Sequence, residues 1–175
     1  QRGRFLSALV RPLVWLAIFA AGFRSVLGLS ITPPYQTYVL YEVYVVPGLA
    51  AMMLLFHAMQ SALAMVYDRE MGSMRLLLTA PLPRWYLLAA RLVASVLVGL
   101  PLVYVFLFVA RYWDVRPPLL GYMAALPALF VCGLMLGAFG LLVSSVSTQM
   151  ENFAAVMNFV IFPMFFASTA LYPLW

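Results

Sequence analysis

Long apolar segments separated by short polar connections dominate this chain. Five segments are long enough to cross a bilayer: residues 13–31, 45–67, 85–110, 119–143 and 152–171. At about 1.5 Å per residue, a helix of about 20 residues covers the hydrocarbon core, which is roughly 30 Å thick. Backbone groups in hydrocarbon must satisfy one another, so each segment is predicted to be an α-helix. The pattern therefore predicts an all-α, polytopic transmembrane helix bundle with five spans.

The composition supports a membrane protein and excludes several kinds of site. The chain is 66% hydrophobic and 9% charged, whereas a soluble domain has about a quarter charged residues. One cysteine, Cys132, and one histidine, His57, leave no pair for a disulfide or a metal cluster within one copy. Because the chain has no lysine, it cannot form a lysine-containing phosphate-binding loop. We expect no catalytic residue, no metal and no cofactor in this chain.

The arginines predict the orientation in the membrane. With a cytoplasmic N-terminus, the inside receives seven arginines and the outside receives three: Arg2, Arg4, Arg11, Arg69, Arg75, Arg84 and Arg91 against Arg24, Arg111 and Arg116. The positive-inside rule favours this arrangement. We attribute the net charge of +5 to loops at anionic headgroups rather than to nucleic-acid binding. Five spans leave the C-terminus outside, so a sixth span is expected and the chain is interpreted as a fragment.

The first eleven residues have two faces. Apolar side chains lie on one side of a helical projection, and Arg4 and Arg11 lie on the other. Residues 1–11 are therefore predicted to form an amphipathic helix in the headgroup region. The alternative is a basic flank that only precedes the first span.

Residues 68–84 contain the densest run of charge, with five of the fifteen charged residues. Such a segment cannot lie in hydrocarbon and must lie at a membrane face. Residues 70–79 include good helix formers, and Pro81 and Pro83 would stop a helix. Gly72 would let another backbone approach closely. We interpret the segment as a short helix at the cytoplasmic surface, offered to a soluble partner. The alternative is a solvated loop that only sets the topology.

Four polar side chains lie within the predicted spans. His57 and Gln60 are one helical turn apart in the second span, and Asn152 and Asn158 lie in the fifth. Polar groups at this depth are costly unless they face protein or water. They either line a translocation path or form hydrogen bonds within the bundle. Pro163 is expected to break the fifth span, and Gly133-Leu-Met-Leu-Gly137 matches the GxxxG helix-packing pattern.

The charged segment resembles the cytoplasmic coupling region of type-2 ATP-binding-cassette (ABC-2) export permeases. Those permeases show an acidic-basic-acidic-x-Gly-Ser/Thr run, then Leu-Leu-x-x-Pro and a basic residue. The matching residues are Asp68-Arg69-Glu70-Met71-Gly72-Ser73, then Leu77-Leu78-Thr79-Ala80-Pro81 and Pro83-Arg84. Residues 150–173 also look like the fifth span of the family and its approach to an outer re-entrant hairpin. One position departs from the family, because Arg75 stands where an acidic residue is common.

The resemblance implies the partners and the location. Two such permeases pair, as a homodimer or as two related chains, and each docks on a separate ATPase subunit that holds ATP and Mg. The residues implied in coupling are Asp68, Arg69, Glu70, Gly72, Ser73, Arg75, Pro81, Pro83 and Arg84. The expected location is the plasma membrane, the inner membrane in bacteria.

Two other classes of membrane protein remain as alternatives. A passive structural or assembly subunit is one, although a cofactor-bearing subunit would show paired histidines in its spans. A secondary transporter is the other, although it would be expected to carry acidic residues within its spans. All five acids of this chain lie in predicted loops or at helix ends.

Overall fold

The computed structural model describes residues 10, 13–18, 21–22, 41–79, 83–113 and 118–168. Within these ranges every regular element is helical: α2 (Tyr41–Glu70), α3 (Ser73–Leu78), α4 (Arg84–Ala110), the 3-10 turn η1 (Arg111–Trp113), α5 (Leu119–Val146) and α6 (Met150–Ala167). Residues 10, 13–18 and 21–22 are also helical. The prediction of an all-α helix bundle is confirmed.

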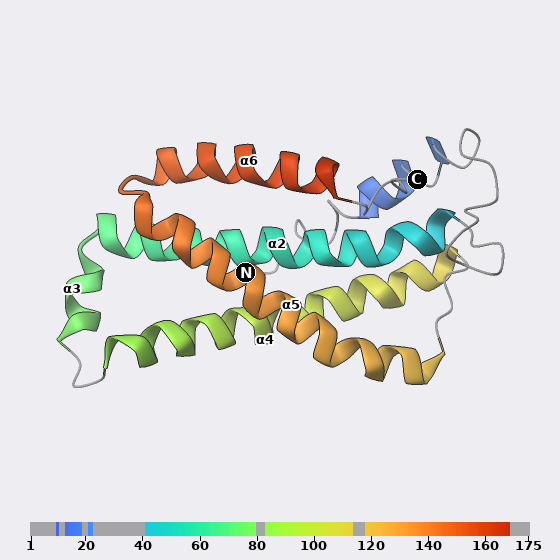
Figure 1. Ribbon diagram of the computed structural model, residues 1–175, viewed down its shortest axis with the longest axis horizontal. Helices are drawn as coiled ribbons and strands as arrows, with labels where there is room; N and C mark the ends of the chain where they lie inside the picture. Colours follow the sequence, from blue (N-terminus) through green and yellow to red (C-terminus); the bar gives the residue numbers. More distant parts are fainter. Residues whose placement is uncertain are drawn as a thin grey trace.

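Helix α2 is the centre of the bundle. The other long helices α4, α5 and α6 all pack on it, and α5 crosses it obliquely while also packing on α4 (Figure 1). In an apolar stretch of 18 residues in α2, 61% of the residues are buried, whereas 17% are buried in the corresponding stretch of α6. The fully buried core side chains include Leu49 and Met59 of α2, Phe106 of α4 and Phe153 of α6. Helix α3 joins α2 to α4 at one end of the molecule (Figure 1).

Four helices in the described part are long and apolar enough to cross a membrane, namely α2, α4, α5 and α6. They correspond to the second to fifth predicted spans. The first predicted span is described only at residues 13–18 and 21–22, where it is helical and Leu16 is fully buried. The interfacial helix over residues 1–11 (apart from helical Val10), Arg24, Pro81 and residues 169–175 lie outside the described residues.

Helix α2 is longer than predicted at both ends. It begins at Tyr41, within the predicted loop, and continues through Glu70. The predicted helix over residues 70–79 instead begins at Ser73. The chain turns between them because Gly72 has a φ of 76°, a left-handed conformation that glycine adopts without steric cost. Nothing in the described chain lies within 4 Å of a Cβ placed on Gly72, so its backbone conformation accounts for the glycine.

The prediction that Pro163 breaks the fifth span was wrong. Helix α6 continues through Pro163 to Ala167, and α4 and α5 likewise contain Pro101 and Pro127. A proline removes one backbone donor from the helix. Within a membrane bundle, neighbouring helices and local adjustments compensate for this loss, so the helix continues.

Glycines of α5 allow close helix contacts. A Cβ on Gly133 would lie 3.0 Å from a Val96 methyl of α4, and one on Gly137 would lie 2.5 Å from a Leu92 methyl. A Cβ on Gly140 would lie 3.2 Å from the carbonyl oxygen of Ala58 on α2. The GxxxG pattern thus packs helices within this chain.

Candidate functional site

The last three residues of α2 carry alternating charges, and each contacts a different helix. We call Asp68, Arg69 and Glu70 the charged triplet. The first contact is an ion pair, in which Arg91 Nη2 of α4 donates to Asp68 Oδ2. The side chains of Arg91 and Asp68 are 30% and 25% exposed, so the pair is largely shielded from water. Asp68 therefore ties α2 to the first two turns of α4.

Arg69 contacts the end of α5. Its Nη1 donates to the backbone oxygens of Ser144, Ser145 and Ser147 at 3.3, 3.5 and 3.3 Å. The last carbonyls of an α-helix have no partner within the helix and carry partial negative charge. A guanidinium group supplies the missing donors and the opposite charge. Arg69 therefore caps the C-terminus of α5 from a different helix.

Glu70 contacts the start of α6. The backbone N–H of Met150, the first residue of α6, donates to Glu70 Oε2 at 3.2 Å. The first N–H groups of a helix lack partners and carry partial positive charge, so a carboxylate is favourable there. The N-cap residue Gln149 makes no side-chain cap of its own. Glu70 therefore takes the capping role from a distance of 80 residues in sequence.

The turn between α2 and α3 is held by further hydrogen bonds. Ser73 Oγ donates to the Asp68 carbonyl at 3.1 Å. The Met71 N–H donates to the Tyr67 carbonyl at 2.9 Å, and the Gly72 N–H donates to the Arg69 carbonyl at 3.2 Å. These bonds fix how α3 leaves α2.

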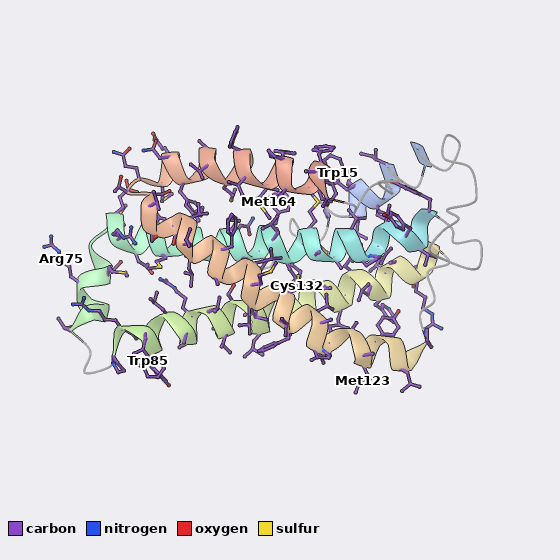
Figure 2. All side chains as sticks on the ribbon, in the orientation of Figure 1. Trp15, Arg75, Trp85, Met123, Cys132 and Met164 are labelled. Atoms are coloured by element: carbon purple, nitrogen blue, oxygen red, sulfur yellow. The ribbon has the colours of Figure 1, made fainter. Side chains whose placement is uncertain are left out.

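The outward surface beside α3 is basic and apolar. Arg75 points away from the bundle at one tip of the molecule, and Trp85 lies on the first turn of α4, on the lower side of this view (Figure 2). Met71 and Trp85 are 62% and 70% exposed, and Arg75 and Arg84 are also exposed. Within the described residues neither arginine has an ion-pair partner. Pro83 is extended and immediately precedes α4.

The polar residues of the spans are not brought together. His57 is half-buried, and its Nε2 lies 3.1 Å from the Ser95 carbonyl of α4. Gln60 is exposed on α2. Asn152 and Asn158 are exposed on α6, and the Asn152 amide donates to Gln149 at 3.2 Å. No hydrogen bond in the described part links His57 or Gln60 to either asparagine.

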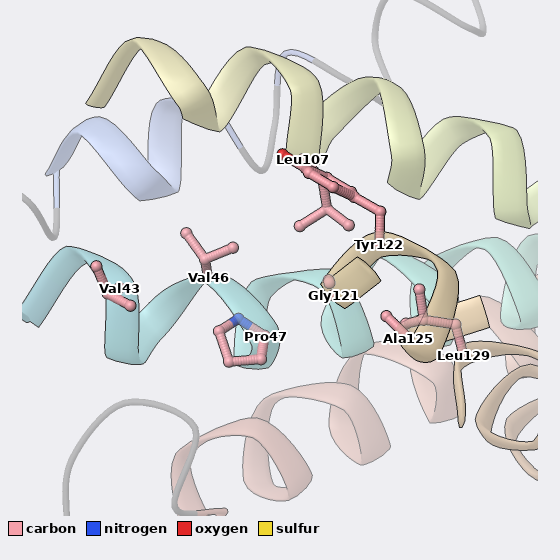
Figure 3. Close-up of a pocket in the computed structure, with 9 residues that line it drawn as sticks. Val43, Val46, Pro47, Leu107, Gly121, Tyr122, Ala125 and Leu129 are labelled. Carbon is pink, nitrogen blue, oxygen red and sulfur yellow. The ribbon is translucent and has the colours of Figure 1, made fainter. Parts of the chain in front are cut away.

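An apolar cavity of about 250 Å³ lies between α2, α4 and α5 (Figure 3). Its α2 residues belong to the first turns of that helix, at the opposite end from the turn into α3. Its lining includes Val46 and Pro47 of α2, Leu107 of α4, and Tyr122 and Leu129 of α5. Small residues, Ala50, Gly121 and Ala125, leave the space open. The cavity can hold an apolar group.

Sequence reasoning missed the partners of the charged triplet. Arg91 lies one turn or so inside the start of the predicted span over residues 85–110, and an arginine there needs a partner, but Asp68 was not predicted as that partner. The backbone oxygens of the α5 end and the Met150 N–H carry no residue-type signal. They could not have been found without the tertiary arrangement.

The described helices and the charged end of α2 define a multi-pass membrane protein with a short helix projecting at one end. The chain belongs to the ABC-2 type transporter family, because the model of that family matches residues 1–175.

Two relatives illustrate this membership. The chain is 26% identical over 174 residues to ycf38 of Cyanophora paradoxa, named as a transport permease; the alignment covers 97% of this chain and 58% of that protein. It is 32% identical over 123 residues to YbhR of Escherichia coli strain K12, named as a multidrug ABC transporter permease, covering 69% of this chain and 33% of that protein. The chain thus spans little more than half the length of the first relative, and no solved structure matches it significantly.

Proposed function

We propose that this chain forms the membrane-spanning part of an ABC-2 exporter and couples to a separate ATPase subunit through α3. The observation that carries the proposal is the position of α3, a short helix with outward-facing Arg75 at the end of four apolar helices. Membership of the ABC-2 type transporter family supports the same function. In this proposal ATP and Mg are bound by the partner subunit, and this chain carries out transport without catalysing hydrolysis.

The charges of the segment suggest what the ATPase presents. The side chains of the charged triplet bind other helices of the same chain, so the carboxylates of Asp68 and Glu70 already have partners. What remains outward is basic and apolar, namely Arg75, Arg84, Met71 and Trp85. Charge complementarity then requires an acidic, partly apolar docking groove on the ATPase.

The remaining parts of the proposal concern assembly and cargo. Two permease chains pair in the plasma membrane, the inner membrane in bacteria, and the cargo passes between them. Many exposed side chains of the four long helices, and the lining of the cavity, are apolar or aromatic. This surface suits an amphipathic cargo, and YbhR is named for multidrug transport.

The test is recruitment of the ATPase. The complete protein is co-expressed with the ABC ATPases encoded beside its gene, and vanadate-sensitive ATP hydrolysis is measured in the purified material. We expect Arg75→Glu to lose the copurified ATPase, because it would place a carboxylate against an acidic groove. Arg111→Glu is the matched control at the opposite end of α4, where Arg111 is exposed and without an ion-pair partner in the described chain.

The control separates docking from general damage. Arg111→Glu is expected to keep the ATPase, and both variants should insert into the membrane. A correctly inserted parent protein that recruits no ATPase would contradict the proposed function and favour a passive structural subunit.

A further inference from the structure

The charged triplet lies next to the proposed docking helix. Only Met71 and Gly72 separate Glu70 from the first residue of α3. The three side chains of the triplet contact α4, α5 and α6 respectively. We infer that the charged triplet is a transmission joint, which makes the α3-side ends of α4, α5 and α6 move with α2 as one body. The inference rests on the proposed function, in which the ATPase moves α3.

A joint can transmit displacement only if its connection to the moving part is stiff. The turn at Met71 and Gly72 is closed by backbone hydrogen bonds on both sides, because the Arg75 N–H also donates to the Gly72 carbonyl at 3.1 Å. The Ser73 hydroxyl adds a bond back to α2. A displacement of α3 therefore displaces the end of α2.

The contacts of Arg69 and Glu70 act on one connected piece. Arg69 holds the end of α5, Glu70 holds the start of α6, and the two ends are separated only by residues 147–149. The backbone oxygens that Arg69 contacts include those of Ser144 and Ser147, whose side chains are buried. The Arg69 guanidinium lies at the negative C-terminus of α5, and the Glu70 carboxylate lies at the positive N-terminus of α6. Both contacts therefore favour the turn between α5 and α6 lying against the end of α2.

The two ends of the bundle differ in how firmly they are held. At the α3 end, all three contacts of the triplet cross between helices. At the opposite end, α2, α4 and α5 line the apolar cavity, and Tyr104 of α4 donates a hydrogen bond to the Tyr122 carbonyl of α5 at 2.8 Å. The charged contacts fix the helix spacing at the α3 end, whereas an apolar cavity leaves room for the spacing to change at its own end.

Distances between spin labels test this inference in the complete protein with its ATPase. After replacement of the native cysteines, Leu88→Cys and Thr148→Cys report the spacing of α4 and the α5–α6 turn at the α3 end. Phe108→Cys and Leu120→Cys report the spacing of α4 and α5 at the opposite end. All four positions are exposed. Labelled copies are diluted with unlabelled ones so that each distance lies within one chain.

In the parent protein we expect the Leu88–Thr148 distance to stay constant between nucleotide-free and vanadate-trapped states, while the Phe108–Leu120 distance changes. Arg69→Met should lengthen and broaden the Leu88–Thr148 distance and abolish the nucleotide-dependent change, with the ATPase still bound. Arg111→Met, the same replacement at the other end, should leave both distances as in the parent. Parent-like distances in Arg69→Met would overturn the inference.

Two further comparisons keep the test decisive. If the parent recruits no ATPase, the proposed function fails, and the Leu88–Thr148 distance of Arg69→Met without nucleotide still tests the joint. If Arg69→Met does not insert into the membrane, the charges of the Asp68–Arg91 ion pair are exchanged instead. In Arg91→Asp alone, the Leu88–Thr148 distance should no longer be the same in the two nucleotide states. In the double variant Asp68→Arg with Arg91→Asp, it should again be the same. A double variant no better than Arg91→Asp would also overturn the inference.

Discussion

At the scale of single residues, His57 and Gln60 show that neighbours decide what a polar side chain does in a membrane helix. They are one helical turn apart on α2. His57 lies against α4, where a Cβ on Gly99 would approach its ring to 3.0 Å, and its Nε2 lies within hydrogen-bond distance of the Ser95 carbonyl. Gln60 is exposed. His57 therefore packs against a neighbouring helix of this chain, whereas Gln60 faces out of the bundle.

These surroundings predict different effects of substitution at His57 and at Gln60. His57→Phe should lower the free energy of unfolding by about 1 kcal/mol, because it removes the contact with Ser95 and enlarges a closely packed ring. Gln60→Leu should not lower it, because the side chain faces out of the bundle. Unfolding of the complete protein in lipid nanodiscs measures both. Equal losses in the two variants would contradict the assignment.

The residue scale also shows the limit of sequence reasoning. The charge density of residues 68–84 predicted that this segment lies at a membrane face, because charged side chains are costly in hydrocarbon. The partners of Arg69 and Glu70 lie 75 to 80 residues away. These partners are backbone groups at helix ends, which every residue type can supply. No pattern along the chain could therefore have identified them.

At the scale of elements, helix α5 depends on its small residues. Its Gly133 and Gly137 face α4 and its Gly140 faces α2, whereas Ala138 is exposed. The glycine spacing was visible in the sequence. The sequence did not show which helices this spacing brings together, because the same spacing also serves contacts between separate chains.

Helix α5 therefore offers a matched pair of variants. Gly140→Leu should lower the free energy of unfolding by about 1–3 kcal/mol, because its Cβ would already be 3.2 Å from a backbone oxygen that cannot move independently. Ala138→Leu adds the same side chain on the exposed face and should be neutral. Thermal unfolding in nanodiscs tests the difference. A neutral Gly140→Leu would show that α2 and α5 can separate without cost.

At the scale of the whole molecule, the orientation in the membrane is still a prediction. Counting arginines places α3 and residues 147–149 in the cytoplasm and η1 outside. The alternation of four described helices is compatible with this, because their connections α3, η1 and residues 147–149 fall at alternate ends of the bundle (Figure 1). The proposed ATPase contact depends on this orientation, since ATP is cytoplasmic.

Labelling from one side of the membrane tests the orientation. With native cysteines replaced, Tyr112→Cys should react with an impermeant maleimide in intact cells, and Thr148→Cys should react only in inverted vesicles. Both residues are exposed, so burial does not limit the reaction. The reverse pattern would contradict both the orientation and ATPase docking at α3.

The sequence by itself determined the helical class, the approximate bounds of the four spans that the structure describes and the resemblance to ABC-2 permeases. These follow from segment hydrophobicity and from a contiguous motif, which are properties of neighbouring residues. Only the tertiary structure decided that the charged triplet ties α2 to three other helices, and that Arg75 faces outward. These depend on which helix ends meet after packing, because the electrostatic preference of a helix terminus acts only within its first or last turn.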